Sequence, residues 1–274
     1  MPNPKEIKEE LKAISAIKTI TVTYQEVSQN KMNEIREEAL KNREFIERLS
    51  RVYASAKIAY LNDDESEPLK KKKGEVVVFI SANARFYGSL LWDVWKTSSD
   101  YLKGKDADLV VIGDVGKYLV QNSDVGEDFS HFELHDEEPE KDQVKKIIEF
   151  IENYERITVF HGKFKNILKQ ESSKTNISGE AIDKDIDVDA DYLFEPSPKE
   201  VLDFFEKELI TAFFNQAFLE HRLSRHATRM VAMHRASENA KEEIEKLEQK
   251  KTRVKRQLLD KKQFEITAPY QLWK

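Results

Sequence analysis

The sequence predicts an α/β protein in which two long terminal helices pair as an antiparallel coiled coil and flank a small Rossmann-like α/β domain with a mostly parallel sheet. All eight glycines lie between Gly74 and Gly179, and no proline occurs in residues 5–67 or 199–268. Both ends of the chain can therefore be uninterrupted helix. Helices of this length overshoot a small domain, so we expect them to find apolar cover on each other or inside a partner.

The first helix is predicted by apolar residues that recur at steps of three and four from the start of the chain. They are Ile7, Leu11, Ile14, Ile17, Ile20, Tyr24 and Val27, and the pattern resumes at Ile35. A charged segment without periodicity, residues 62–74, follows and contains Pro68. We therefore assign residues 1–61 to an N-terminal coiled-coil helix.

The middle of the chain, residues 62–196, has the alternation of a Rossmann-like domain. Its β-branched runs are residues 75–80, 107–112 and 156–160, and helical patterns cover residues 90–102 and 143–154. The polar stretches 122–141 and 170–191 are expected to be loops, each with room for an edge strand. This order predicts a small parallel sheet covered by helices.

A second long helix is predicted for residues 197–274. Ser197 precedes Pro198 and stands three residues before Glu200, which is a helix-start signal. Further on, steps of four and three predict the a/d seam of a coiled coil, interrupted only by Lys251. The predicted seam residues are Ala240, Ile244, Leu247, Val254 and Leu258, facing Ile7, Leu11 and Ile14 of the first helix.

Composition excludes several classes of function. The net charge is −6, which favours neither nucleic acid nor an anionic membrane as a partner. The absence of cysteine excludes disulfides and thiolate chemistry and suits a reducing compartment. The N-terminus has no apolar signal region, and no stretch approaches 18 apolar residues. We expect a cytoplasmic protein without a membrane span.

No motif indicates an active site, a cofactor site or a metal site. The segment Gly113–Lys117 has the wrong spacing for a phosphate loop and is expected to be a strand-to-helix turn. His131 and His135 are four residues apart, but no third ligand follows, so a solvated loop is expected. The remaining histidines, His161, His221, His226 and His234, look isolated in the sequence. The chain is therefore predicted not to be an enzyme by itself.

A cluster of cations near the end of the second helix is the best candidate for a binding surface. It includes Lys250, Arg253, Arg256 and Lys261 and is opposed only by Asp260. A solvated helix face is the alternative interpretation. Without aromatic side chains or a groove-reading motif, an acidic protein is a better partner than DNA.

Several segments together resemble the gamma subunit of F-type ATP synthases, and the resemblance covers both termini and most of the middle. Residues 5–7, 20–21 and 31–32 resemble the family's first helix, and residues 111–117 its strand-turn. The most specific matches are residues 191–198 (DYLFEPSP), 226–233 (HATRMVAM) and 236–240 (ASENA). The chain departs from the family at residues 81–89 (SANARFYGS) and after residue 257.

This resemblance implies a non-catalytic rotor shaft of an F-type ATP synthase or ATPase. It implies a ring of three alpha and three beta subunits around the helices, and an epsilon subunit and a membrane c-ring at the middle domain. Arg256 and Gln257 match the family's Arg-Gln pair that engages a beta subunit, and Lys250, Arg253 and Lys261 would face acidic beta surface. The location implied is the inner face of the cell membrane, through the complex.

Two alternatives are compatible with the sequence. The altered segments also suit the shaft of a specialised F1-like ATPase that hydrolyses ATP for another mechanical task. A static helical adaptor that has lost its ring is the third interpretation. Gene neighbourhood would separate the first two, since a synthase needs genes for its proton ring, delta and epsilon subunits.

Overall fold

The structure is a computed structural model that describes residues 4–62, 72–84, 87–125, 128–178 and 194–271. The chain divides into two compact units. One unit consists of the residues up to Ser28 together with those from Arg229 onward, and the other runs from Gln29 to Thr228. The boundary between the units therefore cuts through both long helices rather than following the three predicted segments.

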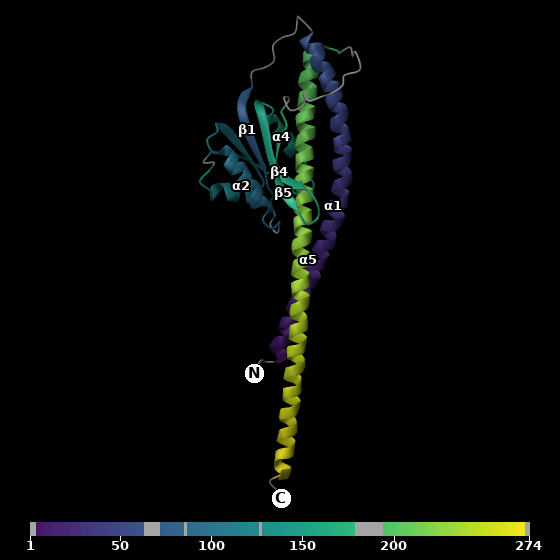
Figure 1. Cartoon of the computed structure of the whole chain (residues 1–274), viewed down its shortest axis with the longest axis vertical. Helices are drawn as coiled ribbons and strands as arrows, with labels where there is room; N and C mark the ends of the chain where they lie inside the picture. The colour runs from purple at the N-terminus through teal and green to yellow at the C-terminus, as the bar shows by residue number, and fades with distance from the viewer. Residues whose placement is uncertain (1–3, 63–71, 85–86, 126–127, 179–193, 272–274) are drawn as a thin grey trace. The chain divides into compact units, whose positions relative to one another are not determined.

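The two long helices are α1, Pro4–Leu61, and α5, Pro198–Gln271. Both are continuous, as expected from their lack of internal glycine and of internal proline over most of their length. The predicted start of α5 is confirmed, because the Ser197 hydroxyl accepts the Glu200 backbone N–H at 3.3 Å. The two terminal helices, with a sheet formed by residues between them in the sequence, are the predicted fold class (Figure 1).

The larger unit contains a five-stranded sheet in the order β3-β2-β1-β4-β5. All neighbouring strands are parallel except β4 and β5. The strands are β1 Lys73–Ile80, β2 Ala107–Ile112, β3 Ser130–Phe132, β4 Tyr154–Phe164 and β5 Gln170–Asn176. The three predicted strands are confirmed. The two polar stretches each supply one edge strand, β3 and β5.

Helices cover both faces of this sheet. On one face, α2 (Leu90–Leu102) and α3 (Asp114–Gln121) pack on Val77, Phe79 and their neighbours. On the other face, α4 (Lys141–Ile151) and α5 pack on Val76 and Val78. The run EVVVFI is apolar without alternation because, as in other parallel sheets, both of its faces are buried.

Helix α5 is an inner layer of this unit. Ile210, Phe214 and Phe218 of α5 belong to the same buried cluster as the sheet. On its other side, α5 contributes Leu202 and Leu209 to a cluster with Leu49 and Tyr53 of α1. The predicted 62–196 segment thus supplies only α4 for this face of the sheet, and α5 completes the core.

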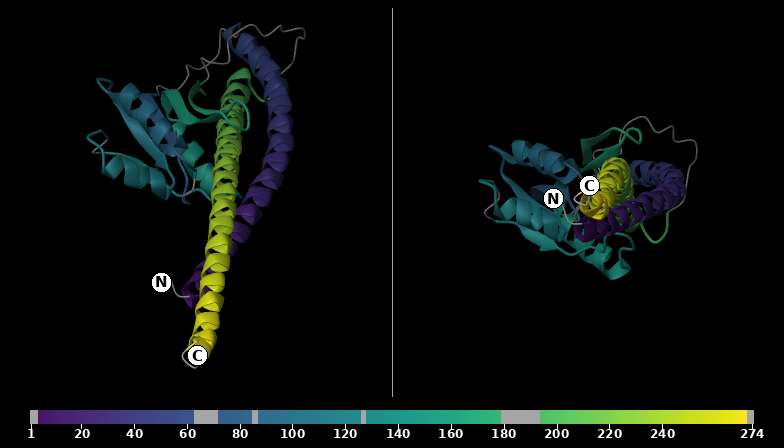
Figure 2. Two further views of the ribbon diagram at one scale, coloured as in Figure 1. Left: turned by 60° about the horizontal axis from the view of Figure 1, so that its bottom comes forward. Right: turned by 90° about the horizontal axis from the view of Figure 1, so that it is seen from below.

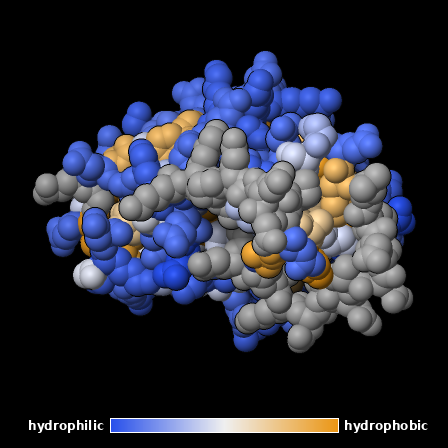
Figure 3. Space-filling model, turned by 90° about the horizontal axis from the view of Figure 1, so that it is seen from above, coloured by the Kyte–Doolittle hydropathy of each residue, from blue (hydrophilic) through white to orange (hydrophobic). Residues whose placement is uncertain are grey.

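Apolar side chains also reach the surface of this unit. Ile58, Leu61 and Phe204 are 46%, 69% and 60% exposed. Figure 3 shows apolar patches on one face, separated by hydrophilic side chains. Large exposed apolar residues near the end of α1 and the start of α5 are more typical of a contact surface than of a fully solvated one.

The turn after β2 explains two glycines of the segment that superficially looked like a phosphate loop. Gly113 has a φ of +93°, which side chains rarely adopt, and a Cβ there would lie 2.9 Å from the Ala82 backbone. A Cβ at Gly116 would lie 2.7 Å from the Ser81 Cβ. The segment is the predicted strand-to-helix turn, packed tightly against the residues that follow β1.

The smaller unit is a pair of helices, the beginning of α1 beside the second half of α5 (Figure 2). Ile7, Thr21 and Ser28 are buried on α1, and Ala240, Leu247 and Val254 are buried on α5. The described residues do not cover the whole predicted stripe, however. The exposed fractions of Ile17, Ile20, Tyr24 and Val27 lie between 46% and 54%.

Candidate functional site

The predicted contact residues all lie on the exposed surface of α5 in the smaller unit. Lys250, Arg253, Arg256, Gln257 and Lys261 are exposed, as are all other residues from Lys255 to Glu265. A helix turns by about 100° per residue, so four of the five side chains share a stripe roughly 80° wide. Arg256 lies about 60° beyond Arg253, its neighbour one turn back, at the edge of this stripe. The five side chains therefore form one broad face of about 140°.

The predicted seam residues differ in burial. Ile7, Ala240, Leu247 and Val254 are buried, and Leu11, Ile14 and Ile244 are partly buried. Leu258 is 41% exposed, so the seam within this chain ends at Val254. The reason is that the described part of α1 begins at Pro4 and supplies no cover further along α5.

A second group of polar residues lies on α5 inside the larger unit, and reasoning from the sequence missed it. His221 is fully buried, and its Nδ1 accepts the Gly162 backbone N–H at 2.9 Å. The proton is therefore on Nε2, which donates to the Ser81 carbonyl at 3.1 Å. One neutral imidazole thus joins α5 to the ends of β1 and β4.

Arg225 lies one turn further along α5 and is also buried, with 1% of its side chain exposed. Its guanidinium donates to Asp136, to the carboxylate at 2.7 Å and to the backbone carbonyl at 2.7 Å. The same carboxylate accepts the backbone N–H groups of Asn83 and Ala84 at 3.0 Å each. Asp136 therefore ties α5 to the segment that follows β1.

The next residue of α5, His226, extends this network. Its Nε2 donates to the Glu137 carboxylate at 3.0 Å. Burial opposes ionisation of Glu137, but the hydrogen bond and charge of His226 and the charges of Arg225 and Arg222 outweigh it. Together they lower the pKa of Glu137 to about 2. Glu137 is therefore ionised at any physiological pH and holds α5 by charge as well as by packing.

These contacts correct the expectation that His221 and His226 are isolated. Their partners are 59 to 140 residues away in the sequence, and spacing cannot reveal contacts of that range. They meet because the carboxyl ends of parallel strands share one edge of the sheet. We call Asp136, Glu137, His221, Arg225 and His226 the α5 anchor.

Asn83, Ala84 and Tyr87 contact this anchor, which gives the departure from the family pattern at these positions a structural role. Tyr87 is buried, and the Arg225 guanidinium lies over its ring at 5.2 Å from the ring centre. The Asn83 amide donates to the Leu134 carbonyl at 2.8 Å. The bulky ring and the amide fill space between the sheet edge and α5.

The histidines His131 and His135 were expected on a solvated loop. His131 instead lies on strand β3, and its side chain is only 17% exposed. His131 is part of a strand because residues 130–132 pair with the end of β2. His135 is exposed in the following loop, where its Nδ1 accepts the Glu138 backbone N–H.

Comparison with known proteins gives consistent results over nearly the whole chain. Residues 3–268 match the protein family described as ATP synthase. The ATP synthase gamma chain of Cytophaga hutchinsonii is 24% identical, and the alignment covers 98% of each chain. That of Flavobacterium psychrophilum is 28% identical over 88% of each chain.

Solved structures with the same fold belong to ATP synthases. A chain of the mitochondrial ATP synthase of Euglena gracilis gives a TM-score of 0.64 at 13% identity and covers 98% of this chain and 94% of its own. A chain of the central stalk and c-ring structure from Tetrahymena thermophila gives 0.61 at 18% identity, covering 80% and 99%. At these identities the likeness shows the fold alone.

The fold is that of a small α/β body whose sheet packs on a long helix, α5. The family match then identifies it: the chain belongs to the ATP synthase family, and its relatives within that family are gamma chains. It is a non-catalytic subunit of the ATP synthase complex. None of the described helices is long and apolar enough to cross a membrane.

Proposed function

We propose that this chain is the central rotor stalk of an F-type ATP synthase and couples its own rotation to conformational change in the catalytic beta subunits. The observation that carries the proposal is the family match over residues 3–268, which includes both long helices and the middle domain. A match to the middle domain alone would support only a shared fold.

The anchor supports this mechanical role. A rotating helix transmits torque only if it is fixed to the body that turns. Arg225 and His226 fix α5 to the loop after β3 through a buried ion pair at 2.7 Å and a hydrogen bond at 3.0 Å. Phe214 and Phe218 add apolar packing against the sheet. Beyond Val254, residues 255–265 of α5 are exposed and accessible to partners.

The exposed end of α5 fits a ring of three alpha and three beta subunits. A shaft can drive three equivalent subunits into different states only if it contacts each of them differently. The cationic cluster meets this requirement because it occupies only one side of α5, a sector of about 140°. Lys250, Arg253, Arg256, Gln257 and Lys261 would therefore face one beta subunit at a time. Cationic side chains favour acidic beta surface.

The middle domain would then sit towards an epsilon subunit and a membrane c-ring, and the complex would lie on the inner face of the cell membrane. Coexpression of the tagged chain with alpha and beta homologues from the same genome tests the assignment. We expect a complex with about one copy of this chain per three beta chains, as the ring geometry requires. Reproducible recovery of alpha and beta without this chain would contradict it.

The contact residues can be tested in the same complex. Replacing Arg256 and Gln257 together with Ala should slow ATP hydrolysis without releasing the chain. Lys241→Ala is a matched control, because Lys241 is an exposed cation of α5 outside the cluster, paired only with Glu238 at 3.9 Å. Equal rates for the double variant and the control would remove these residues from the proposed contact.

A dedicated ATPase is distinguished from a synthase by whether the complex makes ATP or only hydrolyses it. Membrane vesicles that carry the whole complex should make ATP when a proton gradient is imposed. Hydrolysis without gradient-driven synthesis would favour the specialised motor.

A further inference from the structure

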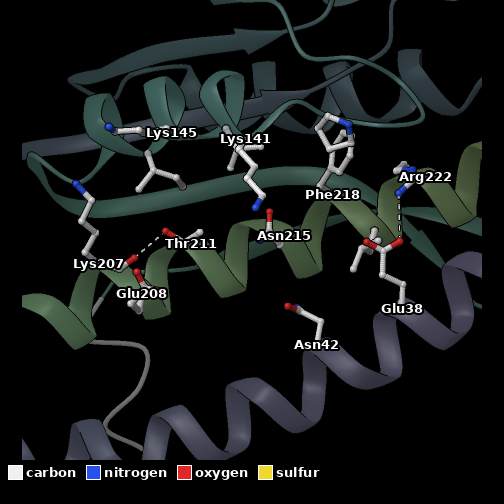
Figure 4. A pocket seen from close by; sticks show the side chains of 14 residues that line it. Glu38, Asn42, Lys141, Lys145, Lys207, Glu208, Thr211, Asn215, Phe218 and Arg222 are labelled. Atoms are coloured by element: carbon white, nitrogen blue, oxygen red, sulfur yellow. Dashed lines mark hydrogen bonds and ion pairs between the residues drawn. The ribbon is translucent and has the colours of Figure 1, made fainter.

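The larger unit contains a cavity that neither the rotor role nor the anchor uses. Its volume is about 530 Å³, and its walls come from α1, α4 and α5 (Figure 4). All of its lining residues belong to the unit between Gln29 and Thr228. The volume is within the range of small-molecule sites, roughly 300 to 1,000 Å³.

Cations outnumber anions around this cavity. Lys141, Lys145, Lys207 and Arg222 line it, whereas the lining carboxylates are those of Glu38 and Glu208. Lys207 is engaged by Glu152 at 3.0 Å, Lys145 by Glu149 at 3.8 Å, and Arg222 by Glu38 at a long 3.5 Å. Among the described residues, no carboxylate pairs with Lys141, and this lysine favours an anionic ligand.

One polar group at the cavity lacks a partner in the part of the chain that the structure describes. The Arg222 side chain is 8% exposed, and its buried Nε has no hydrogen-bond partner there. A buried guanidinium N–H without a partner costs free energy unless a ligand or water accepts it. Figure 4 shows the Lys141 ammonium reaching from α4 towards Asn215 of α5, with Glu38 and Asn42 facing them from α1. Lys141 and Arg222 therefore supply cationic donors to the same cavity.

Apolar side chains line the same space. Val144 and Ile148 of α4 face it, as do Phe218 and Leu219 of α5. Ile148, Phe218 and Leu219 are at most 5% exposed, so they form a fixed wall rather than a mobile one. A ligand that satisfies the donors and also covers this wall has an anionic group and a flat apolar body.

We propose that this cavity binds a small organic phosphate that carries a ring. The phosphate accepts hydrogen bonds from Arg222 and Lys141, and the ring packs on Phe218 and Val144 while Asn215 contacts its polar edge. Arginine and lysine suit a phosphate because charge-assisted hydrogen bonds are the strongest that such side chains make. The ligand contacts three helices at once, so its binding stabilises the packing of α1 and α4 on α5.

Calorimetric titration of the full chain with AMP and with phenyl phosphate tests this site, with inorganic phosphate as the probe that lacks a ring. We expect dissociation constants below about 1 mM for at least one ring-bearing probe, and at least about tenfold weaker binding of inorganic phosphate. Failure of both ring-bearing probes to bind by about 10 mM overturns the proposal. Equal affinity for inorganic phosphate overturns it too, since the apolar wall would then be unused.

A pair of charge-reversal variants locates the binding. Lys141→Glu should raise the dissociation constant of the ring-bearing probe about fivefold or more, because it replaces an attractive charge at the cavity with a repulsive one. Lys146→Glu is the matched control, since Lys146 is an exposed lysine of the same helix that does not line the cavity. Circular dichroism checks that both variants fold. Equal weakening in the two variants, or none in Lys141→Glu, places the binding elsewhere and overturns the proposal.

Discussion

Replacement of Asp136 by Asn is the sharpest test of the α5 anchor. The change keeps the size of the side chain but removes the charge that faces the buried Arg225. Oδ1 accepts from Arg225 at 2.7 Å, and Oδ2 accepts from the Ala84 N–H at 3.0 Å. In either orientation, the new NH₂ group must face one of these donors. Rotation of the amide therefore cannot repair the site.

The expected cost follows from the burial of the pair. The side chains of Arg225 and Asp136 are 1% and 15% exposed. Breaking a buried ion pair by removing one partner costs about 3–5 kcal/mol, because the other charge is left buried. For a unit of roughly 200 residues, that lowers the midpoint of thermal unfolding by about 6–20 °C.

Urea unfolding of the full chain, followed by tryptophan fluorescence, measures this effect. Trp95 is a suitable reporter because it is 2% exposed and packs on Phe79. Glu133→Gln is the control, since Glu133 is an exposed acid on the same loop, and its free energy of unfolding should change by less than about 0.5 kcal/mol. A change below about 1 kcal/mol in Asp136→Asn would refute the view that Asp136 holds α5.

Three further predictions concern pH, a turn and the seam. Burial lowers the pKa of His161 and of His221, so both stay neutral in the folded chain while the unfolded chain protonates them below about pH 6.5. The free energy of unfolding should be highest above that pH. Below it, the free energy should fall by up to about 1.4 kcal/mol per pH unit for each histidine; a urea midpoint unchanged between pH 7 and 5.5 would disprove this. Gly113→Ala should cost about 2–5 kcal/mol of unfolding free energy, since φ at Gly113 is +93° and the added Cβ would lie 2.9 Å from the Ala82 backbone. Gly74→Ala should cost less than about 1 kcal/mol, because a Cβ there would meet no atom within 4 Å. Leu247→Ala should cost about 2–4 kcal/mol, seen as faster hydrogen exchange along the seam, because Leu247 is 4% exposed; Leu258→Ala, at 41%, should leave exchange nearly unchanged.

Local signals in the sequence were sufficient to predict α1, α2, α4, α5 and the three central strands. Helix α2 and strand β2 begin and end where the pattern predicts, at Leu90–Leu102 and Ala107–Ile112. Their signals are strong because both elements bury a continuous apolar face. Strands β3 and β5 gave no such signal, since their side chains are mostly half-buried and polar. Edge strands of this kind are set by pairing with a neighbour rather than by their own composition.

The anchor could not be predicted because its contacts depend on topology. Asp136 and Arg225 are 89 residues apart, and neither lies in a recognisable motif for an ion pair. Only the order of the strands brings the loop after β3 beside the segment after β1. One signal was available, however. His221, Arg222, Arg225 and His226 fall on a stretch of α5 where residues 221–227 are all buried. Four basic residues in a stretch otherwise made of Leu, Ser and Ala suggest a buried polar network.

The exposed part of the stripe on α1 has a meaning of its own. A three-and-four period identifies an apolar face but not the protein that covers it. Within the smaller unit, Ile7, Thr21 and Ser28 of α1 are buried, so one side of α1 is already occupied. Ile17, Ile20, Tyr24 and Val27 form an apolar strip beside it, with 46–54% of each residue exposed. A helix that only paired with α5 would place polar side chains there. An exposed apolar strip of this length is the pattern expected when other proteins enclose the pair, as the proposed ring would.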